Sequence, residues 1–289
     1  MFKKIFVVGA GQMGVGISQV CAMAGYQVCL MDKQLTACEN GKKQAWVSTQ
    51  KLVQKDKMPT KALTGVEEMV LTTDLQAAAE SDLVIEAVSE CIEVKQQVFV
   101  QLNDICKPSC IFASNTSSIP ITQLASFTNR AQQFIGLHFM NPVPLMQLVE
   151  VISGHHTAGE VRDQCEQFIL SLNKKSCHAQ DYPGFIVNRI LMPMINEAFN
   201  TLMEQVGSAE DIDLAMRLGT HQPMGPLALA DFIGLDTCLA IMNVLYEGFK
   251  DPRYRPSPLL IKYVSSGCLG RKTGAGVFAY SEEDPAVRA

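Results

Sequence analysis

The first thirty-two residues constrain the fold of this chain more than any other segment. The run Lys4–Val8 is β-branched and aromatic and ends at once at a glycine, which is typical of a buried parallel strand. Residues 9–14 then read GxGxxG, and an uncharged stretch suited to a buried helix continues to Ala24. Gly25 ends that helix, and a second apolar strand runs to Asp32. The segment therefore predicts a β-α-β unit with a dinucleotide-binding turn.

Each glycine of this turn has a physical reason to be there. The first allows the tight turn, the second lets a pyrophosphate approach the backbone, and the third lets helix and strand pack closely. Free N–H groups and the helix dipole then meet the phosphates. Asp32 can accept hydrogen bonds from a ribose 2′-hydroxyl, which favours NAD, although Lys33 beside it leaves NADP open. The predicted cofactor-binding residues of this segment are Gly9, Gly11, Gln12, Met13, Gly14 and Asp32.

The composition excludes several classes of function. With 47% hydrophobic and 18% charged residues, the 289-residue chain is globular, and its length suits one large domain or two smaller ones. Its net charge of −5 argues against nucleic acid as a partner. Five glycines interrupt the uncharged segment Ile5–Met31, so we expect neither a membrane span nor a signal peptide. Ten cysteines without a CxxC pair predict reduced thiols, a cytoplasmic protein and no metal site.

Strand and helix patterns alternate through the first part of the chain and predict a doubly wound, mostly parallel α/β sheet. The link from Asp32 to Val70 is too long for a simple crossover and predicts a helix over Leu35–Lys57 followed by a second short helix. Lysines on this insertion could meet an anionic ligand, or could simply form a solvated helix face. These lysines are Lys42, Lys43, Lys51, Lys55 and Lys57. The further strands are expected at 70–72, 83–87, 111–114, 134–139 and 149–152.

Two strand ends carry polar side chains. The segment Ser114–Ser118 follows a buried strand, where ligands bind in open α/β sheets, but the same residues could cap a helix that begins near Pro120. His138 lies at the end of the next strand, and Glu150 stands among four aliphatic residues, where a buried carboxylate needs a partner. A carboxylate on one imidazole nitrogen leaves the other as a base. The pair is therefore a candidate catalytic dyad, with a purely structural histidine as the alternative.

These motifs together resemble the L-3-hydroxyacyl-CoA dehydrogenase family, in particular its short single-function members. The matching segments are GAGQMG at Gly9, SNTSS at Ser114, HFMNPVPLMQLVEV at His138, DYPGFIVNR at Asp181 and RKTGAGVFAY at Arg271. The resemblance covers nearly the whole chain. It implies a Rossmann-type fold and an NAD-dependent oxidation of an (S)-3-hydroxyacyl-CoA, such as 3-hydroxybutyryl-CoA, to the 3-ketoacyl-CoA, and the reverse reaction.

The resemblance implies a role for each residue of the catalytic centre. His138 takes the proton of the 3-hydroxyl group while hydride leaves C3, and Glu150 orients the imidazole and offsets its charge. Ser117, Asn141 and Asn188 match residues that hold the substrate oxygens and order the nicotinamide side. The implied catalytic set is His138, Glu150, Ser117 and Asn188.

Contacts to the two larger ligands are implied in the same way. Glu90 and Lys95 match residues that contact the nicotinamide half of the cofactor, as do Ser117 and Asn141, and Lys272 is a weaker match. Ser48 and Lys55, seven residues apart on the inserted helix, match a pair that contacts coenzyme A.

The remainder of the chain has helical periodicity, with helices expected at 185–205, 209–218, 226–246 and 258–265. We therefore expect an NAD-binding domain over 1–182 and a helical domain over 183–289. The resemblance makes the second domain a dimerisation domain that closes over the acyl thioester of an acyl-CoA substrate. Two alternatives stay open: a related dehydrogenase of a free hydroxy or sugar acid, and a non-catalytic dinucleotide-binding protein.

Overall fold

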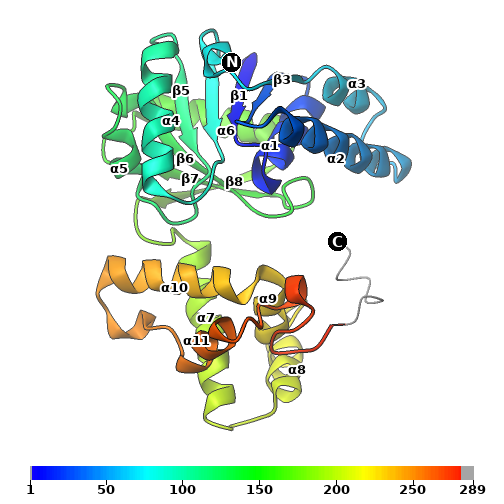
Figure 1. Ribbon diagram of the computed structural model, residues 1–289, viewed down its shortest axis with the longest axis vertical. Coiled ribbons are helices and arrows are strands. Elements are labelled where there is room, and N and C mark those ends of the chain that lie inside the picture. Colours follow the sequence, from blue (N-terminus) through cyan, green and yellow to red (C-terminus); the bar gives the residue numbers. More distant parts are fainter. Residues whose placement is uncertain (1, 281–289) are drawn as a thin grey trace. The chain divides into compact units, whose positions relative to one another are not determined.

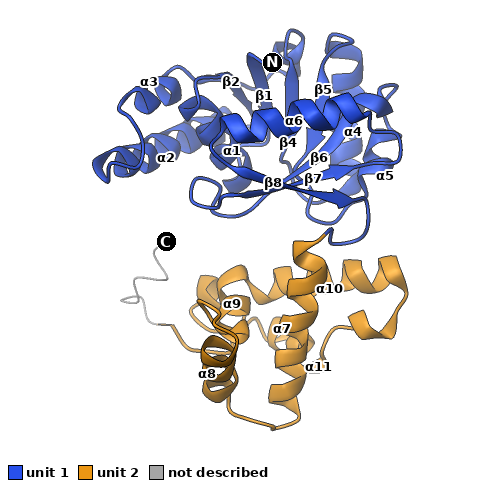
Figure 2. Cartoon of the chain, turned by 180° about the vertical axis from the view of Figure 1, so that it is seen from behind, with its two compact units in different colours: residues 1–185 blue, residues 186–289 orange. Residues whose placement is uncertain are grey.

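The structure is a computed structural model that describes residues 2–280. The chain divides into two compact units, residues 1–185 and 186–289, which Figure 2 colours separately. The division comes after residue 185, whereas the sequence pattern places it after residue 182. Unit 1 combines strands and helices, and the described part of unit 2 is helical.

Unit 1 is built on one sheet that has eight strands within the described residues, in the order β3-β2-β1-β4-β5-β6-β7-β8 (Figure 1). Neighbouring strands are parallel except β6 and β7, which are antiparallel. The order 3-2-1-4-5-6 is that of doubly wound dinucleotide-binding sheets. The strands are β1 Lys4–Val8, β2 Gln27–Met31, β3 Val70–Thr72, β4 Leu83–Glu86, β5 Ile111–Ser114, β6 Phe134–Phe139, β7 Leu148–Ser153 and β8 Lys175–Gln180.

The predicted fold class is confirmed by the way both faces of the sheet are covered. In β1, Ile5 and Val7 enter one hydrophobic core while Phe6 and Val8 enter the other. The first core includes α1 and α6, and the second includes α4 and α5; α4 lies in front of the sheet in Figure 1 and α6 in Figure 2. Burial on both faces explains why these strands read as continuous apolar runs. The helices are α1 Gln12–Met23, α4 Ile92–Ile105, α5 Ile121–Ala125 and α6 Gly159–Ser171, with 3₁₀ turns η1 Leu75–Ala78 and η2 Ala131–Gln133.

The long link between β2 and β3 forms a helical pair, as predicted, made of α2 Leu35–Gln54 and α3 Lys61–Glu67. The first helix ends three residues before the expected Lys57. Lys42 donates through Nζ to the backbone oxygens of Glu67 and Met69 at 2.7 and 2.8 Å. This lysine therefore closes the helical pair, and contact between the lysines of the insertion and an anionic ligand stays a prediction.

The strand β8 was not predicted. Its sequence KSCHAQ has no β-branched or aromatic residue and alternates in burial only weakly. It nevertheless pairs in parallel with β7 over six residues. Pairing with a buried neighbour decides this element, because intrinsic strand propensity depends strongly on context.

Unit 2 contains α7 Val187–Met203, α8 Ala209–Gly219, α9 Pro226–Ile233, α10 Leu235–Phe249 and α11 Pro258–Ser265, with 3₁₀ turns η3 Pro252–Tyr254 and η4 Arg271–Thr273. The expectation of one helix over 226–246 is wrong. Gly234 has φ +101° and separates α9 from α10, whose axes differ by 98°. A glycine at positive φ ends a helix without the strain that other residues carry.

Neither membrane spans nor metal clusters are found in the part of the chain that the structure describes. There, no single helix is long and apolar enough to cross a bilayer; only α9 and α10 taken together reach that length and hydropathy, across their sharp bend. Within residues 2–280, no group of three or more His, Cys, Asp or Glu side chains is placed to hold a metal ion.

An acid-sensitive ion pair ties the first strand to the start of β4. Asp82 accepts from the backbone N–H groups of Lys3 and Lys4 at 2.7 and 3.0 Å and from Lys107 Nζ at 2.6 Å. Burial alone would raise the pKa of Asp82, but Lys107 and the two amides outweigh it and lower that pKa to about 2.

Because the folded pKa of Asp82 lies below its unfolded value, its contribution to stability is complete above pH 4 and is lost as the pH falls toward 2. We expect Asp82→Asn to lower the urea midpoint at pH 6 and to flatten its decline between pH 4 and pH 2. The exposed Glu68→Gln is the matched control. An unchanged pH profile in the Asp82 variant would contradict this assignment.

Candidate active site

The glycine-rich turn lies where the strand order reverses, between β1 and β4. Gly9 has φ +103°, and a Cβ there would lie 2.5 Å from the backbone oxygen of Ala87. A Cβ on Gly14 would lie 1.8 Å from the backbone oxygen of Gly9, so the first turn of α1 rests directly on the strand end. Gly11 is different, because a Cβ added there would meet no neighbouring atom within 4 Å. The space above Gly11 is thus open for a ligand, while Gly9 and Gly14 serve close backbone packing.

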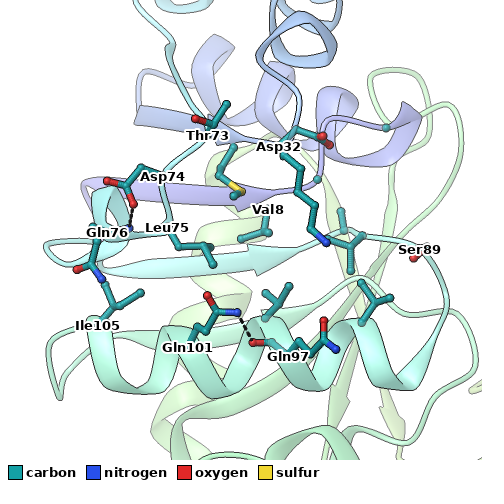
Figure 3. Close-up of a pocket in the computed structure, with 18 residues that line it drawn as sticks. Val8, Asp32, Thr73, Asp74, Leu75, Gln76, Ser89, Gln97, Gln101 and Ile105 are labelled. Atoms are coloured by element: carbon teal, nitrogen blue, oxygen red, sulfur yellow. Dashed lines mark hydrogen bonds between the residues drawn. The ribbon is translucent and has the colours of Figure 1, made fainter.

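A cavity of about 730 Å³ opens beside this turn (Figure 3). Its walls include Gly9, Gly11 and Asp32, and Gln97 and Gln101 rise toward it from α4. The Asp32 carboxylate accepts from the backbone N–H of Ala10 at 2.8 Å and from that of Gln34 at 3.1 Å. These bonds fix the carboxylate at the end of β2. Gln12, Met13 and Gly14 form the start of α1 and do not line the cavity.

His138 and Glu150 are direct cross-strand partners. They occupy opposite positions in the antiparallel pair β6 and β7, so both side chains project from the same face of the sheet. His138 Nδ1 lies 2.7 Å from Glu150 Oε2, and His138 Nε2 lies 3.0 Å from Ser117 Oγ. The carboxylate is fully buried, and the histidine is 6% exposed. The arrangement gives an imidazole with one nitrogen held by an acid and the other presented to a hydroxyl group, which is the geometry of a general base.

A second buried carboxylate lies at the end of β4. Glu86 accepts from Lys95 Nζ at 2.7 Å, from Ser114 Oγ at 2.5 Å and from the backbone N–H of Val88 at 2.7 Å. Lys95 Nζ also lies 3.2 Å from Glu90 Oε2. Lys95 is only 1% exposed although its residue type is normally solvated, and its two carboxylate partners account for that.

Sequence reasoning missed Glu86, although the signal was available. LVIE in β4 places a glutamate at the end of an aliphatic strand, which is the same pattern that singles out Glu150. Asp181 was missed as well: its carboxylate accepts from the backbone N–H groups of Ile121 and Thr122, at the start of α5. The alternative interpretation of Ser114–Ser118 as a cap for that helix is therefore wrong, because Asp181 supplies the capping bonds.

Three other predicted residues of unit 1 form no hydrogen bond with His138 within the described part of the chain. Asn141 is exposed in the loop that joins β6 to β7. Ser48 Oγ accepts from Gln19 Nε2 of α1 at 3.0 Å, and Lys55 is the exposed residue that follows the last residue of α2.

Two predicted site residues belong to unit 2. Asn188 is buried in the first turn of α7. Lys272 pairs with both carboxylate oxygens of Asp236 at 2.6 Å. In this structure, Lys272, which the sequence predicts to contact the cofactor, therefore forms an ion pair with Asp236.

Comparison with known proteins identifies the family of the chain. The family model of the 3-hydroxyacyl-CoA dehydrogenase NAD-binding domain matches residues 4–182, and that of the 3-hydroxyacyl-CoA dehydrogenase C-terminal domain matches residues 184–280. The chain belongs to the 3-hydroxyacyl-CoA dehydrogenase family. It is an oxidoreductase of that family, as its motifs predicted.

Relatives and solved structures resemble the chain over nearly all of its length. A 3-hydroxybutyryl-CoA dehydrogenase of Bradyrhizobium diazoefficiens is 51% identical over 99% of this chain and 98% of its own. A probable 3-hydroxybutyryl-CoA dehydrogenase of Deinococcus radiodurans is 52% identical over 96% of this chain and all of its own. The crystal structure of (S)-3-hydroxybutyryl-CoA dehydrogenase from Ralstonia eutropha superposes with a TM-score of 0.94 at 44% identity, covering 98% of this chain and 100% of that one.

The glycine turn offers a test that separates packing from ligand approach. In Gly14→Ala the new methyl group meets backbone at 1.8 Å, so we expect a loss of roughly 1–3 kcal/mol or more in the free energy of unfolding. In Gly11→Ala the methyl group enters open space, so stability should change little while the Kd for NADH rises at least about tenfold, because a pyrophosphate no longer reaches the backbone.

Urea unfolding and NADH fluorescence titration of the two variants would measure these effects. Each variant serves as the control for the other. Equal losses of stability in both, or unchanged NADH affinity in Gly11→Ala, would contradict the two assigned roles.

Proposed function

We propose that this protein oxidises (S)-3-hydroxybutyryl-CoA to acetoacetyl-CoA with NAD, and catalyses the reverse reduction. The observation that carries the proposal is the imidazole of His138, held by the buried Glu150 at Nδ1 and facing Ser117 at Nε2. Close similarity to enzymes named 3-hydroxybutyryl-CoA dehydrogenase supports the short acyl chain.

The dyad supplies the proton chemistry. In the oxidative direction, His138 Nε2 removes the proton of the substrate 3-hydroxyl group as the C3–H bond breaks. Glu150 fixes the tautomer with Nε2 unprotonated and stabilises the imidazolium that results. Ser117 Oγ, already 3.0 Å from Nε2, holds the substrate oxygen beside the base, and Asn141 and Asn188 are proposed to complete its orientation. In the reductive direction, His138 returns the proton to that oxygen.

The residues present fit a dinucleotide. Gly11 leaves open space over the backbone at the start of α1, and Asp32 stands fixed at the wall of the 730 Å³ cavity. When bound, NAD supplies a nicotinamide ring that accepts the hydride from C3. Asp32 is proposed to bind the ribose 2′-hydroxyl, where a 2′-phosphate would be repelled. Glu90 and Lys95 are proposed to face the nicotinamide half, with Lys272 contributing from unit 2.

Further parts of the proposal concern coenzyme A, assembly and compartment. Ser48 and Lys55 are proposed to contact coenzyme A, for which the exposed Lys55 offers a positive charge to phosphate. Unit 2 is proposed to mediate a homodimer. We also propose that the protein works in the reducing cytoplasm, because all ten of its cysteines are free thiols.

The first test is the loss of NADH absorbance with acetoacetyl-CoA, run in parallel with NADPH and with free acetoacetate. We expect rapid turnover with NADH and the thioester, at least about tenfold slower turnover with NADPH, and little with the free acid. Preference for NADPH would overturn the role of Asp32. Preference for free acetoacetate would replace the proposed substrate by a free keto acid.

Substitution of the base tests the mechanism. We expect His138→Ala to lose roughly two to four decades in kcat, as is typical when a general acid–base is removed, with the Kd for NADH nearly unchanged. His155→Ala, which alters an exposed histidine of the same unit, is the control. Stopped-flow and steady-state rates would measure both variants. Turnover of His138→Ala near the wild-type rate would disprove the dyad.

A further inference from the structure

We propose that Glu90 is a positioning residue that fixes the backbone carrying Ser117 and thereby holds Ser117 Oγ against His138. The inference rests on the proposed function, because it assigns Glu90 a part in the proton-transfer side of the same site. It goes beyond a cofactor contact, which is all that the sequence motif assigns to this residue.

One carboxylate oxygen of Glu90 accepts hydrogen bonds from three consecutive residues, 116–118. Glu90 Oε1 accepts from Thr116 Oγ1 at 2.6 Å, from the backbone N–H of Ser117 at 2.9 Å, and from Ser118 through both its backbone N–H at 3.1 Å and its Oγ at 2.9 Å. The residue at the centre of this turn is Ser117, whose Oγ lies 3.0 Å from His138 Nε2. The orientation of the Ser117 side chain therefore depends on a backbone that Glu90 holds.

The number of these bonds limits what else Oε1 can do. A carboxylate oxygen offers about two lone-pair sites, and four donors already share this one. Any contact to the cofactor is left to Oε2, which lies 3.2 Å from Lys95 Nζ. The two oxygens of Glu90 thus have different partners: Oε2 lies beside Lys95, and Oε1 binds the turn that carries Ser117.

Glu90 is itself held in place from the sheet. Lys95 is buried and bonded to the fully buried Glu86, which belongs to the end of β4. Partial burial would raise the pKa of Glu90, but Lys95, the hydroxyls of Thr116 and Ser118 and the Ser117 amide lower it below its usual value. The carboxylate is therefore charged at neutral pH, and charged acceptors form the stronger hydrogen bonds that positioning requires.

The test compares Glu90→Ala and Glu90→Gln with Glu93→Gln. Glu93 is an exposed acid of the same segment that accepts from Cys91 Sγ at 2.9 Å and makes no bond to the turn at 116–118, so it is a matched control. For NADH oxidation with acetoacetyl-CoA, we expect Glu90→Ala to lower kcat by about 10- to 100-fold, since small misplacement of a reacting group has costs of this order. Glu90→Gln should recover part of that loss, and Glu93→Gln should match wild type.

A double-mutant cycle with Ser117→Ala decides between positioning and cofactor binding. If Glu90 acts through Ser117, Glu90→Ala should lower kcat less than about threefold once Ser117 is already alanine. Fully additive losses would overturn the proposal. So would an effect confined to the KM for NADH, which would leave Glu90 as a cofactor contact only.

A measurement without turnover keeps this inference separate from the proposed function. In ¹⁵N-histidine-labelled protein, Glu90→Ala and Ser117→Ala should shift the Nε2 resonance of His138 in the same direction, with thermal unfolding confirming that both variants are folded. An unshifted resonance in folded Glu90→Ala would overturn the inference. If wild-type protein fails to turn over acetoacetyl-CoA, the proposed function fails, and this resonance still tests the position of Ser117.

Discussion

A carboxylate that is buried in a sheet needs a positively charged or hydrogen-bonding partner. This requirement determines which side chains surround the proposed active site. Glu86 ends β4 and Glu150 lies in β7, and both side chains are fully buried. An unpaired buried charge would be far too costly for a domain of ordinary stability. Glu86 is paired with Lys95, and Glu150 with His138. The need to pair a buried carboxylate thus explains why Lys95 and His138 are buried in unit 1.

The pairs Glu86–Lys95 and Glu150–His138 differ in whether the basic partner keeps a nitrogen that can bind another group. Lys95 is enclosed between two carboxylates and buried almost completely, so its charge serves to hold Glu86 and Glu90 in place. His138 gives only Nδ1 to its acid and keeps Nε2 for Ser117. One sheet therefore holds both a buried Lys–Glu ion pair and an imidazole whose second nitrogen lies beside a hydroxyl group, and we propose proton transfer only for the imidazole.

Sequence could predict the parts of this architecture that local physics determines. The turn at Gly9, the apolar strands β1 to β7 and the pairing demand of Glu150 each follow from patterns that have few structural solutions. The strand β8 could not be predicted, because its pairing with β7 and not its composition creates it. The bonds from Asp181 to α5 span about sixty residues, and the contacts of Glu90 with residues 116–118 span about twenty-six. Such contacts depend on tertiary placement, for which one sequence carries no local signal.

Residues 277–280 of unit 2 are bonded to its interior. Asp231 is almost fully buried, and its carboxylate accepts from the backbone N–H groups of Val277 and Phe278 and from Tyr280 Oη. Burial and Asp231 together raise the pKa of Tyr280 to about 12, so its hydroxyl remains a donor. A chain that stops before Val277 would lose the three hydrogen bonds that Val277, Phe278 and Tyr280 donate to Asp231. The buried carboxylate of Asp231 would then lack these three donors inside the helical core of unit 2, so a truncation or a fusion junction placed before residue 277 should destabilise the unit.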